Sequence, residues 1–538
     1  MTQKEKDDYD LALKLRRDGI ITTPGEPFEM SDDQEITSLI SRGVFKFERY
    51  NPNEHGNIHI FNSRMVREVK GKTEKPFEKS RLIVQGHSDE EKRSILTQSP
   101  TIQRVSQRLL AAIAPGLDVM LGITIELRDV TQAYPQSKTL LQRDVFARLP
   151  KELVHRYPPN TIMKVILPLY GLAESGVHWW TTYHQHHQER LGMQTSTFDP
   201  CLLVSNGTAE SFGMVGMQTD DTLILATPEF SAMEDEKIRQ ANFRCKPKLI
   251  LSPTQHLDFN GTKLTMDDNR MITVQQKGQS NKINTIDATL PDYPQKQRAR
   301  GAYLASICQP EATFDLSTAA QTQNQPNQED CAKVNKRLNW QKKNPTRGLR
   351  YIPLDLKTAR LIVFVDSSFA NNRDFSSQIG FVVTLANEEA NANASQFKIH
   401  GNILHWSSTK CKRVTRSVLA SEIYGMVDGF DIGIVLSSTL QLITDQLDCP
   451  RIPLVICTDS YSLYECLVKL GTTKEKRLMI DIMSLRQAYE RREINEIRWI
   501  NGDDNPADAM TKTAPNKALE RLIDNNELTI RVEGYVDR

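Results

Sequence analysis

Two adjacent aspartates, Asp220 and Asp221, stand between strand-like apolar segments at residues 212–216 and 223–226. This pattern predicts a β-hairpin that carries both carboxylates at its tip. Carboxylates so close together repel each other unless a cation lies between them, and divalent ions with oxygen ligands serve metal-assisted phosphoryl transfer. The alternative is an Asp-rich turn without a ligand, because aspartate favours turns for local hydrogen-bonding reasons. The pair alone favours the plain turn, so other residues must decide.

A third carboxylate, Asp129, follows an apolar run at residues 120–127 that predicts a buried strand. One carboxylate at a strand end and a pair on a neighbouring hairpin can hold two divalent ions about 3.5–4 Å apart, as nucleotidyl transfer requires. Tyr134 lies shortly after Asp129, where its ring could exclude a ribose 2′-hydroxyl; taken singly, it is better explained as a core aromatic. A first carboxylate set therefore consists of Asp129, Asp220 and Asp221.

A second carboxylate set is spread over the C-terminal part of the chain. Two of its members end apolar strand-like segments, one falls on a predicted helix at residues 418–445, and one lies in a short helix at residues 506–511. A glutamate on an apolar helix face costs free energy unless it is paired or binds a metal ion. The alternative is four ordinary surface acids, which the alternation of strands and helices around them disfavours. The members of the set are Asp366, Glu422, Asp459 and Asp508.

The elements that must position these residues predict a multidomain protein of α/β and α+β class. Residues 1–42 are polar and charged, with at most one short helix at residues 4–18. Helical apolar spacing over residues 101–114 stops at Pro115-Gly116, which predicts the end of that helix. From residue 359 onward, three strands, a helix, a strand, two helices, a strand and a short helix predict an α/β domain around a mixed sheet.

The composition of the 538 residues excludes several classes of protein. A net charge of +1 means that any basic surface must be local. The eight cysteines are scattered without a zinc-ligand spacing, which indicates a reducing compartment. The charged N-terminus is not a signal peptide, and no apolar stretch approaches the length of a membrane span. We therefore expect an intracellular protein without a membrane partner.

One segment, residues 333–350, carries seven basic residues and no acidic one, with Trp340 inside it. It is either a solvated helical face or a track for a nucleic-acid backbone, with aromatic rings available for stacking; the segment alone does not decide between them. The basic residues are Lys333, Lys336, Arg337, Lys342, Lys343, Arg347 and Arg350.

The order of several motifs resembles the reverse transcriptase of copia-type LTR retrotransposons. The motifs are residues 81–86 (Arg-Leu-Ile-Val-Gln-Gly), 129–134 (Asp-Val-Thr-Gln-Ala-Tyr), 169–172 (Leu-Tyr-Gly-Leu) and the hairpin of Asp220-Asp221. The resemblance covers about residues 40–530. It implies that the first set holds the polymerase metal ions, with Asp220 the stronger ligand, and that Tyr134 is the sugar gate. It also implies that Arg81 and Lys79 contact the incoming triphosphate and that Gly171 lets the backbone approach the nucleotide or template–primer.

The C-terminal part resembles ribonuclease H at residues 364–368 (Phe-Val-Asp-Ser-Ser) and 507–512 (Ala-Asp-Ala-Met-Thr-Lys). The resemblance implies that the second set binds two ions that activate water to cut the RNA of an RNA–DNA hybrid. The chain departs from these families at three places. Gln218 stands where the hairpin usually carries an aromatic, and the loop at residues 501–505 lacks a histidine. The turn at residues 173–177 lacks the family's lysine and arginine and gains Glu174, which makes it less attractive to phosphate.

Four histidines, at positions 178, 184, 186 and 187, fall on one predicted helix beside two tryptophans. No cysteine or further ligand accompanies them, so a structural role is favoured over a metal site.

These patterns together predict an RNA-directed DNA polymerase with ribonuclease H activity. The expected cofactor is Mg²⁺ or Mn²⁺, two ions per active site, and the expected partners are RNA or DNA template–primer, RNA–DNA hybrid and dNTPs; oligomeric state is left open. The alternatives are a decayed or domesticated remnant that only binds nucleic acid, and a ribonuclease H alone. We expect a fragment, processed product or truncated copy of a polyprotein. The expected location is intracellular, in the cytoplasm (in virus-like particles for related elements) or in the nucleus. The predicted domains are residues 1–42 (polar segment), 43–276 (fingers and palm), 277–355 (thumb and connection), 356–515 (ribonuclease H-like) and 516–538 (tail).

Overall fold

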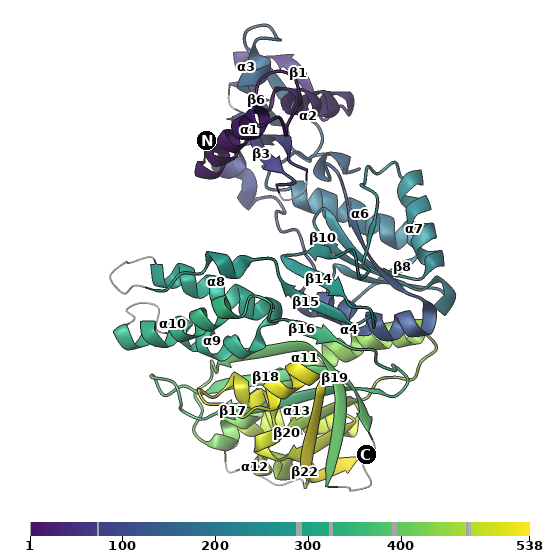
Figure 1. The fold of residues 1–538 in the computed structure, drawn as a ribbon, viewed down its shortest axis with the longest axis vertical. Helices are drawn as coiled ribbons and strands as arrows, with labels where there is room; N and C mark the ends of the chain where they lie inside the picture. The colour runs from purple at the N-terminus through teal and green to yellow at the C-terminus, as the bar shows by residue number, and fades with distance from the viewer. Residues whose placement is uncertain are drawn as a thin grey trace. The chain divides into compact units, whose positions relative to one another are not determined.

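The computed structural model shows two compact units, and the prediction of a multidomain, mixed α/β chain is confirmed (Figure 1). Unit 1 comprises Met1–Thr101, Val130–Leu191 and Ile238–Lys246, and unit 2 comprises Ile102–Asp129, Gly192–Lys237 and Pro247–Arg538. The structure describes residues 2–56, 58–72, 75–286, 293–321, 327–389, 395–469, 473 and 475–537.

Unit 1 is built on a four-stranded sheet in the order β1-β7-β6-β2 and on the β3-β4 hairpin. Its core joins strand residues such as Leu82 and Val145 to Leu39 of a covering helix, all fully buried. The strands are β1 (Phe45–Arg49), β2 (Ile60–Phe61), β3 (Ser63–Lys70), β4 (Phe77–Val84), β6 (Val145–Arg148) and β7 (Thr161–Val165). The helices are α1 (Gln3–Arg17), α2 (Glu29–Ser41), α3 (Pro52–His55), α5 (Lys151–Val154) and α6 (Ser175–Leu191).

The N-terminal segment forms two helices, α1 and α2, where the sequence predicted at most one. They pack on the β3-β4 hairpin, and α2 places Ile36 and Leu39 in the core of unit 1. Buried acids are also paired with cations across the interface, a partnership that the hydrophobic pattern does not reveal. Asp32 of α2 accepts two bonds from the Arg67 Nε at 3.1 and 3.2 Å, and Asp8 of α1 pairs with Lys72.

The first sheet of unit 2 has six strands in the order β12-β5-β11-β10-β9-β8. Helix α4 (Arg104–Leu121) packs against it and α7 (Pro228–Gln240) follows its hairpin. The strands are β5 (Thr124–Asp129), β8 (Met193–Thr195), β9 (Leu202–Ser205), β10 (Gly213–Gln218), β11 (Asp221–Ala226) and β12 (Leu249–Ile250).

Helix α4 does not end at Pro115-Gly116, so that prediction is wrong. The helix continues to Leu121 and is closed by Gly122 in the left-handed conformation, whose N–H bonds the Asp118 carbonyl at 2.9 Å. Gly116 has a packing role: a Cβ there would lie 2.2 Å from the carbonyl oxygen of Leu354. The glycine is therefore required by another segment's close approach, which local helix signals do not reveal.

A second sheet in unit 2, of order β13-β14-β15-β16, lies beside three helices with their own apolar core. The strands are β13 (Leu257–Phe259), β14 (Thr262–Met266), β15 (Ile272–Gln276) and β16 (Leu349–Tyr351). The helices are α8 (Tyr293–Cys308), α9 (Thr313–Gln321) and α10 (Gln328–Lys343).

The C-terminal part of unit 2 is a closed six-stranded barrel of order β17-β18-β19-β22-β21-β20, drawn in green to yellow in Figure 1. Residues 516–538, which the sequence analysis set apart as a tail, form α14 and the strand β22 that pairs with both β19 and β21. The strands are β17 (Ala359–Ser368), β18 (Gln378–Glu389), β19 (Gln396–Lys410), β20 (Leu454–Thr458), β21 (Glu496–Ile500) and β22 (Glu527–Asp537). The helices are α11 (Val418–Gln446), α12 (Tyr461–Val468), α13 (Leu478–Glu490) and α14 (Ala518–Asn525).

Helix α11 is long and apolar enough to cross a membrane by length and composition alone, contrary to the expectation from sequence. It packs against β17 and β18, and 44% of its most apolar window is buried within the protein. A helix in a protein core passes the same test, so this single helix is weak support for a membrane span.

Candidate functional site

Asp366 and Asp459 of the second carboxylate set lie side by side because their strands are parallel neighbours. In the register of β17 and β20, Val365 is opposite Thr458, and each aspartate is the next residue along its chain. Parallel strands bring their carboxyl ends to the same edge of a sheet. The strand-end position read from sequence therefore places two carboxylates together.

Glu422 reaches the same place from the first turns of α11. Ser417 caps this helix, since its Oγ accepts the N–H of Ala420 at 3.2 Å. Gly425 lets the helix approach the strand, because a Cβ there would lie 3.3 Å from the carbonyl oxygen of Asp366. Ligand oxygens of Asp366, Glu422 and Asp459 lie within 4.8 Å of one another, and we call these three the carboxylate trio.

The trio is electrostatically costly without a cation. Burial, and then the charge of Asp459, raises the pKa of Asp366 to about 7. Burial and the charge of Asp366 raise the pKa of Glu422 well above its usual value, and burial raises that of Asp459. The Oε2 atom of Glu422 is buried and has no hydrogen-bond partner among the described residues. An all-oxygen donor set with an unsatisfied oxygen fits a divalent cation such as Mg²⁺ or Mn²⁺.

Asp508, the fourth member of the set, lies next to the trio but outside it. It sits in a 3₁₀ helix, Pro506–Met510, that Asn505 ties to β17 through a bond from its Nδ2 to the Val365 carbonyl at 2.9 Å. Asp508 is paired with Lys512, whose Nζ is 3.9 Å from Oδ1 of Asp366. The structure therefore gathers all four predicted residues at one end of the barrel, three of them around one point.

The raised pKa values predict how stability responds to pH and metal. Folded Asp366 holds its proton to about pH 7, against 3.8 for the ordinary side chain, so the folded state binds more protons than the unfolded state between these values. The free energy of unfolding should therefore fall as pH rises from 4 to 7 in EDTA. Divalent cation should restore it, because it favours the charged form.

The measurement is the difference in Tm between wild type and Asp366→Asn, followed from pH 5 to 8 with EDTA or with Mg²⁺. In EDTA the Tm of Asp366→Asn relative to that of the wild type should rise with pH, and Mg²⁺ should abolish this rise. A difference in Tm that is independent of both pH and Mg²⁺ would contradict this assignment.

The first carboxylate set is joined by strand register. Asp221 begins β11 directly opposite Asp129, the last residue of β5. Directly opposed residues project from the same face of a sheet, so these side chains are neighbours. Asp220 occupies the two-residue hairpin loop with Thr219, which has a positive φ of 53°. All three aspartates are partly exposed.

The two sets differ in how tightly their side chains converge. Among the described residues, only the trio forms a group of three or more acidic, histidine or cysteine side chains whose possible ligand atoms all lie within 4.8 Å of one another. Asp129, Asp220 and Asp221 lie at one edge of their sheet, but they do not form such a group of ligand atoms. The ranking of Asp220 above Asp221 as a ligand stays a prediction.

Two of the predicted substrate residues of unit 1, Arg81 and Tyr134, both contact Tyr170, which the sequence analysis did not identify as a site residue. The Arg81 guanidinium lies 5.8 Å from the centre of the Tyr170 ring, and that ring lies 5.0 Å from the ring of Tyr134. Lys79 is two residues before Arg81 on β4, so both side chains leave the same face of the hairpin. Tyr170 belonged to a recognised motif, and that motif was the signal that could have identified it.

Gly171 has a structural reason of its own. Its φ is 94°, and a Cβ would lie 1.8 Å from the Val84 carbonyl oxygen. The glycine thus allows β4 to lie against the segment that carries Tyr170, whether or not a ligand approaches it.

Glu35 of α2 is a second residue that sequence reasoning missed. Its Oε2 accepts a bond from Gln132 Nε2 at 2.6 Å, and Gln132 in turn accepts from Ser38 at 3.0 Å. Glu35 is buried, and burial raises its pKa. The N-terminal segment therefore holds the loop between Asp129 and Tyr134, a role that its polar composition did not suggest.

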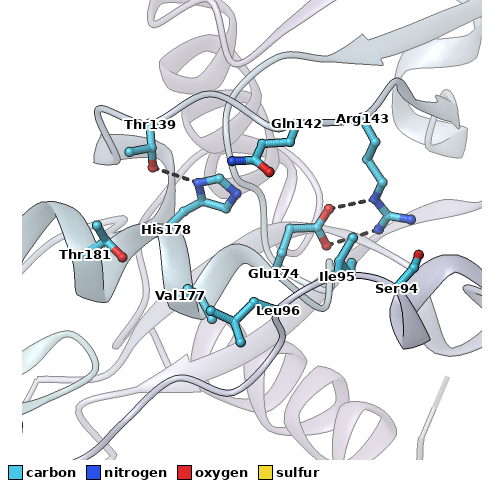
Figure 2. A pocket seen from close by; sticks show the side chains of 10 residues that line it. All are labelled: Ser94, Ile95, Leu96, Thr139, Gln142, Arg143, Glu174, Val177, His178 and Thr181. Carbon is cyan, nitrogen blue, oxygen red and sulfur yellow. Dashed lines mark hydrogen bonds and ion pairs between the residues drawn. The ribbon is translucent and has the colours of Figure 1, made fainter.

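Glu174 of the altered turn is paired with a cation inside unit 1, so its charge is not free at the surface. It is buried, and its Oε1 accepts from Arg143 Nε at 2.8 Å beside a cavity of about 300 Å³ (Figure 2). Arg143 also bonds Asp89 at 2.6 and 2.9 Å and Glu91 at 3.1 Å, so three acids share one guanidinium. The charge gained at Glu174 is thus neutralised within unit 1.

The histidines of α6 pack among aromatic rings, which supports a structural role. Trp180 stacks on His184 with ring centres 4.7 Å apart, and His187 contacts Tyr183 through its ring and through Nδ1. His178 bonds Thr139 at 2.7 Å at the wall of the cavity in Figure 2.

Much of the basic segment is neutralised by acids from elsewhere in unit 2. Arg337 pairs with Asp315 at 2.5 Å, and Arg347 pairs with Glu311 at 2.7 Å. Lys333 and Arg350 also have carboxylate partners, at 2.8 and 3.2 Å. The exposed lysines that form no ion pair with another described residue are Lys336, Lys342 and Lys343 of α10.

Comparisons with known proteins identify distant relatives. No protein-family model matches the chain. The retrovirus-related Pol polyprotein from transposon RE1 of Arabidopsis thaliana is 21% identical over 471 residues, which cover 82% of this chain and 30% of the relative. The transposon Ty1-NL1 Gag-Pol polyprotein of Saccharomyces cerevisiae is 22% identical over 573 residues, which cover 96% of this chain and 29% of the relative. The chain thus spans about 30% of the length of these relatives.

Among solved structures, the foamy viral protease-reverse transcriptase in complex with dsDNA aligns with a TM-score of 0.48 at 11% identity, over 92% of this chain and 93% of that chain. The same viral protein in complex with RNA/DNA hybrid aligns with a TM-score of 0.44 at 10% identity, over 92% of this chain and 60% of that chain.

Proposed function

We propose that this chain, a homologue of the Ty1/copia Pol polyproteins, is an RNA-directed DNA polymerase with ribonuclease H activity. The observation that carries the proposal is that all seven carboxylates of the two sets are present, and that the structure brings the members of each set together. Loss of function by drift would be expected to remove some of the seven carboxylates.

For polymerisation, divalent cations bound at the first set would supply Lewis-acid stabilisation of the phosphate undergoing attack. Asp129, Asp220 and Asp221 would hold these cations at the edge of the sheet. Arg81 and Lys79 bind the triphosphate, because a guanidinium fork pairs with phosphate oxygens. The primer 3′-hydroxyl then attacks the α-phosphate, and pyrophosphate leaves.

For hydrolysis, the trio and Asp508 would hold divalent cations at the end of the barrel, and Mg²⁺ or Mn²⁺ there would supply polarisation of the scissile phosphate of the RNA strand. The buried carboxylates fix the geometry, since α11 and the two parallel strands leave them little freedom. Exposed Lys336, Lys342 and Lys343 are proposed to contact the phosphate backbone of the template–primer or hybrid.

A uniformly labelled RNA–DNA hybrid tests the nuclease half of the proposal. Purified protein with Mg²⁺ or Mn²⁺ should release short RNA fragments from the hybrid and leave double-stranded DNA intact. Hybrid that stays uncut with either metal would refute this half, and cleavage unaffected by Asp459→Asn would show that the nuclease is a contaminant.

Tyr134→Val tests the proposed sugar gate. The change should relax discrimination against ribonucleotides by roughly tenfold to a hundredfold, the scale of one steric contact in a pocket. The measurement is the ratio of kcat/KM for dTTP and UTP on the same template–primer, with the dTTP value as an internal control for folding. An unchanged ratio would count against the gate.

A further inference from the structure

Asp508 is held differently from the other three carboxylates of the second set. Its Oδ2 accepts a hydrogen bond from the backbone N–H of Asn516 at 2.7 Å. Its Oδ1 forms an ion pair with the ammonium of Lys512, four residues later. Both oxygens of Asp508 therefore have partners within the chain, whereas Glu422 keeps a buried oxygen without one among the described residues.

Lys512 is shared between Asp508 and the trio. Its Nζ lies 3.9 Å from Oδ1 of Asp366, and its charge lowers the pKa of each trio member against the effect of burial. Among the described residues, Lys512 is the basic side chain that forms ion pairs with the second carboxylate set. Its side chain is 43% exposed, so the ammonium can move to a partner at the rim of the site.

The loop before Asp508, which Asn516 ties to the Asp508 turn, contains no basic residue. Residues 501–505 contain no histidine, lysine or arginine. Gly502 lies so near Asp459 that a Cβ there would be 3.2 Å from its Oδ2. The basic side chain of this site is thus supplied after Asp508 rather than before it.

We propose that Lys512 is a positioning residue that occupies the place of a second divalent cation until a nucleic-acid phosphate draws its ammonium away. The inference rests on the proposed nuclease function. An ammonium and a divalent ion compete for the same oxygens of Asp366 and Asp508, while the trio can accept a first ion. A phosphate of the hybrid offers Lys512 a charge-assisted alternative, after which the second ion can bind.

The test is to count Mn²⁺ ions bound to the full chain by electron paramagnetic resonance and calorimetry, without nucleic acid. Lys512→Met should bind one more ion than wild type, or bind its weakest ion at least roughly tenfold more tightly, since a unit charge close to the site is removed. Lys512→Arg should behave as wild type. Lys469→Met, which removes an exposed ion pair to Glu465 on α12, is the matched control and should change nothing.

Two further measurements show where the additional Mn²⁺ binds. Adding Asp366→Asn to Lys512→Met should abolish the additional Mn²⁺ binding, which assigns it to the second set. Excess hybrid should raise the number of Mn²⁺ ions bound by wild type to that of Lys512→Met. Equal counts and affinities for wild type, Lys512→Met and Lys512→Gln would overturn the proposal. Because no turnover is measured, the two hypotheses fail separately: a chain that binds no Mn²⁺ contradicts the proposed function, whereas binding indifferent to Lys512 contradicts only this inference.

Discussion

Replacing Asp129 with asparagine should lower primer extension by roughly 10²–10³-fold, the cost of removing one preorganised electrostatic contact in a transition state. The substitution keeps the shape of the side chain, and Asp129 lies opposite Asp221 at the edge of the six-stranded sheet. The loss should fall on kcat rather than on the KM for template–primer, because the carboxylate acts on the reacting phosphate.

The measurement is single-turnover incorporation of dTMP by Asp129→Asn and wild type, with hybrid cleavage assayed in parallel. Cleavage should be unchanged, since it depends on the second set. Asp144→Asn, on an exposed carboxylate paired with Lys164 at 2.8 Å, is the matched control. Near-normal extension by Asp129→Asn would remove the first set from catalysis.

Asp366→Asn should produce the opposite separation, with hybrid cleavage reduced by roughly 10²–10³-fold or more and primer extension retained. Asp366 is the hub of the second set: its ligand oxygen meets those of Glu422 and Asp459, and it accepts a bond from Thr511 and faces Lys512. Replacing its carboxylate with an amide removes a negative charge that would bind the cation together with Glu422 and Asp459.

Cleavage of a labelled hybrid and extension of its primer can be followed in the same reaction, again with Asp144→Asn as control. Normal hybrid cleavage by Asp366→Asn would show that the trio is a buried acidic cluster without a catalytic role. Loss of both activities together would indicate unfolding instead, which the Tm of the variant would reveal.

The sequence predicted the parts of the sites that depend on local pattern. Strand-end carboxylates, the long helix that carries Glu422 and the strand order around them are readable from apolar runs and their lengths. The convergence of Asp366 with Asp459 follows from parallel pairing once the strands are recognised. Each of these sequence patterns lies within a few residues of the feature that it predicts.

What the sequence did not reveal depends on contacts between distant segments. Gly116 reads as a helix stop, yet it accommodates the Leu354 carbonyl. Glu174 reads as a repulsive surface charge, yet Arg143 neutralises it. The basic run from residue 333 is compatible with a free track, yet acids from outside α10 pair with three of its members, Arg337, Arg347 and Arg350. In each case the deciding partner is far away in the chain, so composition and spacing could not supply it.

Primer extension on poly(rA)/oligo(dT) with purified wild-type protein decides whether this chain is a working reverse transcriptase. With Mg²⁺ or Mn²⁺ present, we expect template-dependent incorporation of dTMP that EDTA abolishes and Asp129→Asn nearly eliminates. Absence of dTMP incorporation with either metal, from protein that is folded and binds the template–primer, would contradict this expectation.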